Sequence, residues 1–97
     1  MPVKRSEASI QEAVVKYARK RGIVAIKLST NGRFGSSGWP DYLFLPPKAP
    51  TFMVEFKSEL GVLSALQKER IKEINDRISV YLVDNVALGK KIVERYL

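Results

Sequence analysis

Apolar residues near the start of the chain repeat at the spacing of an α-helix with one buried side. Between residues 6 and 21 these apolar positions are Ile10, Ala13, Val14, Tyr17 and Ala18. Ser6 or Ser9 is suited to cap the start, and Ser9 with Glu12 has the spacing of a capping box. Gly22 follows a basic last turn and marks the end. We therefore expect a helix over residues 6–21.

Short β-branched and apolar runs predict strands in the rest of the chain. The expected strands cover residues 23–29, 41–45, 51–57 and 78–83, and the last of them is expected to be buried. A glycine-rich loop at 30–40 and a proline-rich turn at 46–50 separate the first three strands. Cap residues and helical spacing predict two further helices, over 64–77 and from 84 or 85 to 96. Gly89 is expected to weaken the second of them.

The resulting order, α-β-β-β-α-β-α, predicts a fold of the α/β (α+β) class, with a mixed sheet flanked by helices. The segments 41–45 and 51–57 are expected to pair as a hairpin. The chain has 97 residues, of which 45% are hydrophobic, and this is the size of one compact domain. We therefore treat residues 1–97 as a single domain.

Charge narrows the range of partners. Seventeen Lys and Arg against ten Asp and Glu give a net charge of +7, which predicts a polyanionic partner such as nucleic acid. Cysteine and histidine are absent, so disulfides, thiolate zinc sites and imidazole-based catalysis are excluded. No apolar run approaches the ~20 residues that span a bilayer. We expect a cytoplasmic protein without a membrane partner, whose chemistry would use carboxylates, amines and hydroxyls.

Two short motifs carry the candidate chemistry. Gly38-Trp39-Pro40-Asp41 opens one expected strand, and Glu55-Phe56-Lys57 ends the next. Side chains alternate along a strand, so Glu55 and Lys57 share one face, which we expect to be a surface. In a hairpin the start of the first strand lies beside the end of the second, which brings Asp41 to the same sheet edge. Paired carboxylates suit Mg²⁺ or Mn²⁺.

The ordered set of motifs resembles the VRR-NUC (virus-type replication-repair nuclease) domain in its stand-alone viral form, within the PD-(D/E)XK nuclease superfamily. The resemblance runs from about Ser6 to the end of the chain. Its elements are Ser-Glu-x-x-Ile-Gln in the first helix, Gly-x-Pro-Asp, Glu-Phe-Lys, and Gly-x-x-Ser-x-x-Gln before the next helix. Such a domain implies a restriction-endonuclease-like α-β-β-β-α-β core.

The resemblance implies a role for each motif residue. The metal-binding acids of the family fall on Asp41 and Glu55, and its catalytic lysine falls on Lys57. The backbone carbonyl of Phe56 is a candidate further ligand. Lys57 would orient or deprotonate the attacking water and stabilise the charge that develops on the phosphate.

Two further positions would complete the site in such a domain, and they match Glu7 and Gln67. Helical spacing favours Glu7 over Glu12, because Glu7 lies within the buried arc of the first helix and Glu12 on the opposite side. Gln11 shares the face of Glu7. Glu7 would be a direct or water-mediated third acid, and Gln67 would position the lysine or the water.

Each residue also has a purely structural interpretation. Asp41 after a proline is a common turn acid, and Glu55 with Lys57 could form a charged strand edge that discourages aggregation. Glu7 could be a first-turn acid favoured by the helix dipole. Gln67 could be an ordinary glutamine in the first turn of a helix.

Contacts to nucleic acid are expected mainly from the glycine-rich loop. The loop has no following Gly-Lys-Ser/Thr and opens no helix, so we expect no nucleotide cofactor. Trp39 could stack on a base or sugar, or serve the core or a dimer. Two basic clusters, at 16–21 and 90–95, are solvated helix faces, of which one could bind DNA. The expected nucleic-acid contacts are Lys27, Asn31, Arg33, Ser36, Ser37 and Trp39.

The leading functional hypothesis is a metal-dependent, structure-specific DNA endonuclease. The resemblance implies a homodimer that cuts branched DNA such as Holliday junctions, and two-fold symmetry suits a symmetric cut. Two alternatives stay open. One is a non-catalytic, basic nucleic-acid-binding protein, and the other is a nuclease that acts on flaps or duplex DNA.

Overall fold

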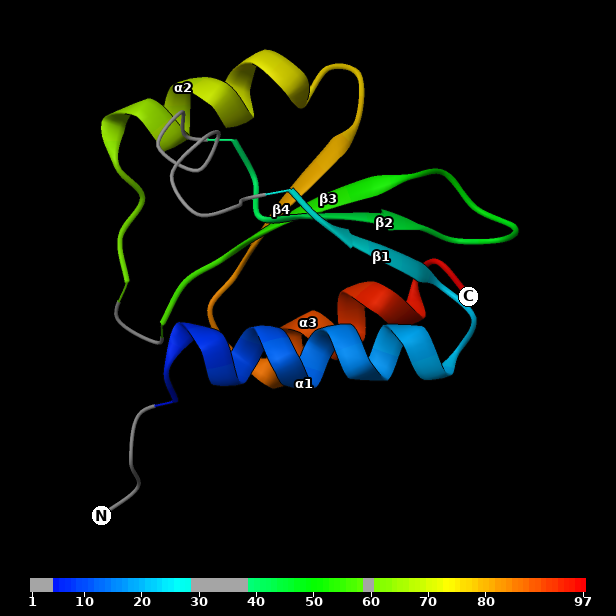
Figure 1. Ribbon diagram of the computed structural model, residues 1–97. Helices are drawn as coiled ribbons and strands as arrows, with labels where there is room; N and C mark the ends of the chain where they lie inside the picture. Colours follow the sequence, from blue (N-terminus) through cyan, green and yellow to red (C-terminus); the bar gives the residue numbers. More distant parts are fainter. Residues whose placement is uncertain (1–4, 29–38, 59–60) are drawn as a thin grey trace.

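The computed structural model describes residues 5–28, 39–58 and 61–97, and in them the helices and strands follow the predicted order (Figure 1). The fold is α+β, with three helices and one four-stranded mixed sheet, as the sequence predicted. The elements are α1 (Glu7–Lys20), β1 (Val24–Lys27), β2 (Tyr42–Leu45), β3 (Phe52–Phe56), α2 (Ala65–Ile74), β4 (Ser79–Val83) and α3 (Val86–Glu94).

The sheet has the order β1-β2-β3-β4. The first three strands pair antiparallel, with Tyr42 opposite Val54 in the predicted hairpin, and β4 pairs parallel to β3, with Tyr81 opposite Val54. A parallel pair needs a crossover connection, and α2 lies within it. Figure 1 shows α2 on one side of the sheet and α1 with α3 on the other.

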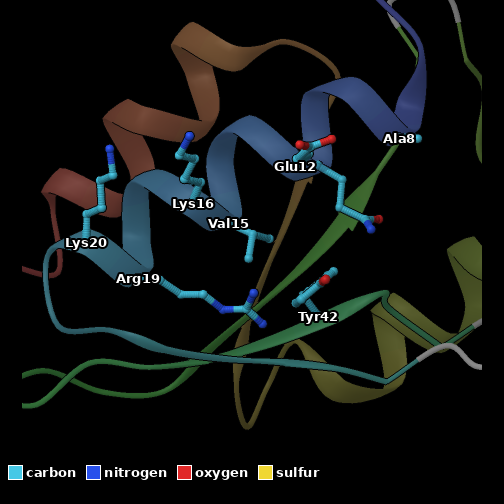
Figure 2. A pocket seen from close by; sticks show the side chains of 8 residues that line it. Ala8, Glu12, Val15, Lys16, Arg19, Lys20 and Tyr42 are labelled. Atoms are coloured by element: carbon cyan, nitrogen blue, oxygen red, sulfur yellow. The ribbon is translucent and has the colours of Figure 1, made fainter.

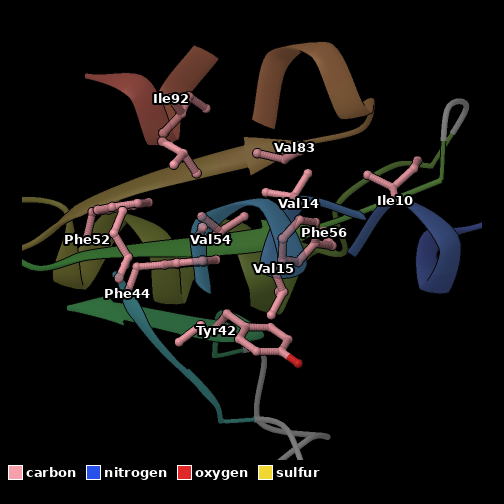
Figure 3. Packing of buried hydrophobic residues seen from close by; sticks show 14 residues of the cluster. Ile10, Val14, Val15, Tyr42, Phe44, Phe52, Val54, Phe56, Val83 and Ile92 are labelled. Atoms are coloured by element: carbon pink, nitrogen blue, oxygen red, sulfur yellow. The ribbon is translucent and has the colours of Figure 1, made fainter. Parts of the chain in front are cut away.

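The hydrophobic core lies between the sheet and the α1–α3 layer (Figure 3). Aromatic rings from β2 and β3 meet there, and the ring centroids of Phe44 and Phe52 are 4.9 Å apart in a stacked arrangement. The Phe52 ring also stacks on Tyr96, beyond the end of α3, at 4.1 Å. The core therefore joins the hairpin to α1, near the start of the chain, and to Tyr96, near its end.

Gly89 lies at the contact between α1 and α3 and is buried. A Cβ atom at this position would lie 2.4 Å from Cγ2 of Val14, which is itself buried. The expectation that Gly89 weakens α3 misses this contact. The missing side chain is what allows the two helices to pack closely, and this outweighs the low helix propensity of glycine.

Two local predictions were wrong. The side chain of Ser6 caps α1 by accepting from the Ser9 N–H at 3.1 Å, so the predicted Ser9–Glu12 capping box is not the cap. The strand predicted to be buried, β4, lies at the edge of the sheet, and only its last residue, Val83, is fully covered. No helix in the three described ranges is long and apolar enough to cross a membrane.

Candidate metal centre

Asp41 is held at the junction of β1, β2 and β3. Continuing the register of the hairpin by one step from Tyr42 and Val54 puts Asp41 opposite Glu55. Oδ2 of Asp41 accepts a hydrogen bond from the Phe56 N–H at 2.9 Å, and its backbone carbonyl accepts from the Leu28 N–H at 2.7 Å. The two motifs that the sequence singled out are therefore in direct contact.

Glu55 is the only charged side chain that is buried in the part of the chain that the structure describes, with 2% of its surface exposed. Gln67 Nε2 donates to Glu55 Oε2 at 2.9 Å, whereas Glu55 Oε1 is buried without a hydrogen-bond partner. A buried oxygen in this state is unfavourable unless another group compensates it. Because β3 is a central strand and Glu55 is covered, the expectation of a surface residue at a sheet edge was wrong, and the charged-edge alternative fails with it.

Burial raises the pKa of the Glu55 carboxyl to about 8. The charge of Asp41, the charge of Glu7 and a side-chain hydrogen bond with Asp41 raise this pKa further, and the Lys57 ammonium opposes them. Desolvation and like charge both favour the protonated form. With no cation bound, the Glu55 carboxyl therefore keeps its proton up to about pH 8 beside Asp41.

Gln67 is a first-turn residue of α2 that also contacts Glu55. Its Oε1 accepts from the Ser64 N–H at 2.9 Å and its own N–H donates to Ser64 Oγ at 3.1 Å, which completes a capping box at the start of α2. The same carboxamide uses Nε2 to hold Glu55. Gln67 therefore contacts Glu55, whereas the sequence suggested that it would position Lys57 or the attacking water.

Glu7 lies in the first turn of α1 and is exposed, although the helical pattern suggested an inward position. Partial burial, and then the Asp41 carboxylate, raise the pKa of Glu7, while Lys57 and Lys27 lower it. Its carboxylate thus faces the same charges as Glu55. Within the described residues no group of three or more acids is close enough to hold a metal ion.

Lys57 follows β3 directly and is half-buried. Its N–H donates to the Val83 carbonyl at 3.0 Å, so the backbone is fixed by β4. Its ammonium acts on the carboxyls of both Glu55 and Glu7. The lysine is therefore the cation of this site.

Gly61 lies close to Lys57 and Ser58, a contact that the sequence did not indicate. Its N–H donates to the Ser58 carbonyl at 2.8 Å, and a Cβ atom on Gly61 would lie 3.0 Å from Cβ of Lys57. A side chain here would press on the lysine. The available signal was a glycine four residues after the Glu-x-Lys motif.

The expected nucleic-acid contacts are described only in part. Lys27 ends β1, is exposed, and lies near enough to Glu7 to lower its pKa. Trp39 is 40% exposed, with the Arg70 guanidinium 4.9 Å from its ring centroid, so it is not a core residue. The remaining four predicted contacts, Asn31, Arg33, Ser36 and Ser37, lie outside the described residues.

The donor set fits a hard divalent cation. Asp41 and Glu55 offer carboxylate oxygens, including the unpartnered Glu55 Oε1, and Mg²⁺ and Mn²⁺ prefer oxygen ligands. In a strand the N–H and C=O of one residue point to the same side. The Phe56 N–H points to Asp41, so the Phe56 carbonyl is expected on that side too.

No protein-family model matches the sequence, and no curated protein matches it.

Proposed function

We propose that this protein is a metal-dependent DNA endonuclease that hydrolyses phosphodiester bonds, similar to VRR-NUC domains. The observation that carries the proposal is the buried Glu55, whose Oε1 has no partner and whose neighbour is another carboxylate. A buried carboxylate beside a second carboxylate is unfavourable on its own. A divalent cation held by Asp41 and Glu55 would compensate the charge of the two carboxylates.

Each residue of the site has its own role in the hydrolysis. When bound, Mg²⁺ or Mn²⁺ neutralises charge on the phosphate and lowers the pKa of a water ligand. Lys57 orients or deprotonates the attacking water and stabilises the negative charge that builds on the phosphate oxygens. The water oxygen bonds to phosphorus, the bond from phosphorus to one sugar oxygen breaks, and that oxygen takes a proton. Gln67 acts as a positioning residue, because it fixes the carboxyl of Glu55.

A non-catalytic DNA-binding protein explains the site less well. Such a protein gains from its net charge of +7 but gains nothing from burying Glu55 beside Asp41, since carboxylates repel phosphate. We retain cleavage of flaps or plain duplex DNA as the second candidate function.

We propose branched DNA as the substrate and a homodimer as the active form. Support for a dimer comes from the face of the sheet that α2 covers in part, where the outer strands still expose large apolar side chains: Val24, Ile26 and Leu82. A small domain gains stability when a partner covers such a surface. Two sites related by a two-fold axis suit paired nicks in a four-way junction.

A cleavage assay with Mn²⁺ on labelled junction, flap, splayed and duplex DNA tests the proposal. We expect Asp41→Asn and Glu55→Gln to abolish cutting while DNA binding is kept or tightened, because each removes a metal ligand and a negative charge. The matched controls are Asp76→Asn and Glu69→Gln, at exposed positions near the end of α2 and within it. Near wild-type cutting by either site variant would contradict the assignment.

A further inference from the structure

The solvent-facing side of α1 carries a cluster of exposed cations that the proposed site does not use. We call it the α1 basic surface, and its residues are Lys16, Arg19, Lys20 and Arg21, with Lys90 from α3. Two hollows flank it. One, of about 610 Å³, lies between α1 and β2 (Figure 2), and the other, of about 460 Å³, lies between α1 and α3. Lys16 and Lys20 line both.

The charge of this surface is largely unbalanced. The hollow beside α3 is lined by four cations and no acid, and the hollow beside β2 contains one acid, Glu12. Nearby Glu94 accepts a hydrogen bond from the Tyr17 hydroxyl. Among the described residues neither Lys16 nor Lys20 forms an ion pair. Like charges four residues apart destabilise a helix by about 0.2–0.5 kcal/mol, whereas Lys20, in the last turn of α1, is favoured there by the helix dipole.

The arginines of the surface are already fixed by the fold. Arg19 Nη2 donates to the Ala25 carbonyl at 3.0 Å, and Figure 2 shows its guanidinium reaching toward Tyr42. Arg21 Nη1 donates to the Tyr17 carbonyl at 3.1 Å, and its guanidinium carbon lies 3.4 Å from the Tyr17 ring centroid. Each guanidinium keeps further N–H groups for an anion. Holding them in place lowers the entropy lost on binding.

We propose that the α1 basic surface binds the phosphate backbone of a duplex DNA arm that leads away from the metal centre. This inference rests on the proposed function. Glu7 at the centre begins α1, and at 1.5 Å per residue Lys16 and Lys20 lie about 14 and 20 Å further along the helix axis. Phosphates on one strand of DNA are about 3.4 Å apart along the axis. Lys20 therefore lies about six base pairs from the metal centre along such a duplex.

The aromatic residues of the two hollows favour duplex over single-stranded DNA. Proteins that hold single strands stack the bases on exposed aromatic rings. Here Tyr42 is buried, and the ring of Tyr17 is occupied by Arg21 and by Lys90, whose Nζ lies 5.0 Å from its centroid. Figure 2 shows Lys16 and Lys20 pointing away from Tyr42, as cations that contact a backbone would. The surface thus offers charge without a stacking platform.

The test is a salt titration of DNA binding in EDTA, with the full chain and a labelled duplex or its separate strand. Lys16→Ala with Lys20→Ala should weaken duplex binding by about tenfold or more and lower the slope of log affinity against log salt by about two, which corresponds to two lost phosphate contacts. The matched control is Lys68→Ala with Lys72→Ala, which removes two exposed lysines at the same spacing from α2.

An unchanged slope in the α1 pair, or an equal loss in the α2 pair, would overturn the proposal. If the protein binds the single strand more tightly than the duplex, and this binding depends on Lys16 and Lys20, the ligand of the surface is a single strand and the proposal of a duplex arm is wrong. Because alanine is a better helix former than lysine, both pairs are expected to fold, and circular dichroism verifies this. Binding in EDTA is independent of cleavage. If the α1 pair lowers the slope as expected but the protein cuts no DNA, the proposed function is refuted and the DNA-binding surface is not.

Discussion

Replacing Glu55 with glutamine isolates the energetic effect of the buried carboxyl, because the amide has nearly the same shape but carries no charge. In the fold the pKa of Glu55 is about 8, against 4.5 for an ordinary glutamate. The folded state thus holds this proton more tightly than the unfolded chain. The stability that the proton contributes is fully present below about pH 4.5 and is lost as the pH rises through 8.

The magnitude follows from the pKa difference. One pKa unit corresponds to about 1.36 kcal/mol, so the wild-type protein should lose about 4 kcal/mol relative to Glu55→Gln between pH 5 and pH 8. Above pH 8 the difference should level off. Urea unfolding followed by circular dichroism in EDTA measures the free energy of unfolding of both proteins at each pH.

The control is Glu69→Gln, an exposed glutamate in α2, for which the difference from wild type should be nearly constant with pH. A constant difference for Glu55→Gln as well would refute the argument that Glu55 is buried and charged at high pH. Added Mn²⁺ should restore most of the stability that the wild type loses by pH 8. Metal at 100 times its Kd stabilises the protein that binds it by about 2.7 kcal/mol, and Glu55→Gln should not respond.

Three further changes test the site, the packing and the assembly. Lys57→Ala should lower turnover by about 10²- to 10⁴-fold while the thermal shift with Mn²⁺ persists, because an ammonium does not bind a cation; loss of that shift would contradict its role. Gly89→Ala should destabilise the fold by about 1–2 kcal/mol in urea unfolding, and adding Val14→Ala should recover part of the loss unless the helices do not touch there. Ile26→Glu should convert a dimer to a monomer in light scattering while Leu97→Glu does not, and a dimer that survives Ile26→Glu excludes this face.

The sequence predicted the elements of the fold because each depends on local signals. The apolar spacing of α1 and the two runs that flank the proline-rich turn are features of neighbouring residues, and the pairing of Asp41 with the end of β3 follows from hairpin geometry. Strand alternation also predicted that Glu55 and Lys57 lie on the same face of the sheet. Alternation cannot show what covers that face.

The errors concern contacts between distant segments. Glu55 is buried because α2 returns over the sheet and brings Gln67 to it, and no pattern around residue 55 contains that information. Gly89 was misjudged for the same reason, since its value depends on Val14, 75 residues earlier in the chain. The position of β4 at the sheet edge depends on strand order, which a short apolar run does not specify.

Gln67 shows how the fold and the candidate site depend on each other. Its carboxamide caps α2 through Ser64 and holds Glu55 with the remaining N–H. The same side chain therefore fixes where the crossover helix begins and how the buried acid is oriented. If α2 began one residue later, the amide would rotate by about 100° around the helix and lose Glu55. The orientation of the buried acid is thus fixed by a side chain in the first turn of a helix, twelve residues further along the chain, which explains why the motif around residue 55 alone could not predict its burial.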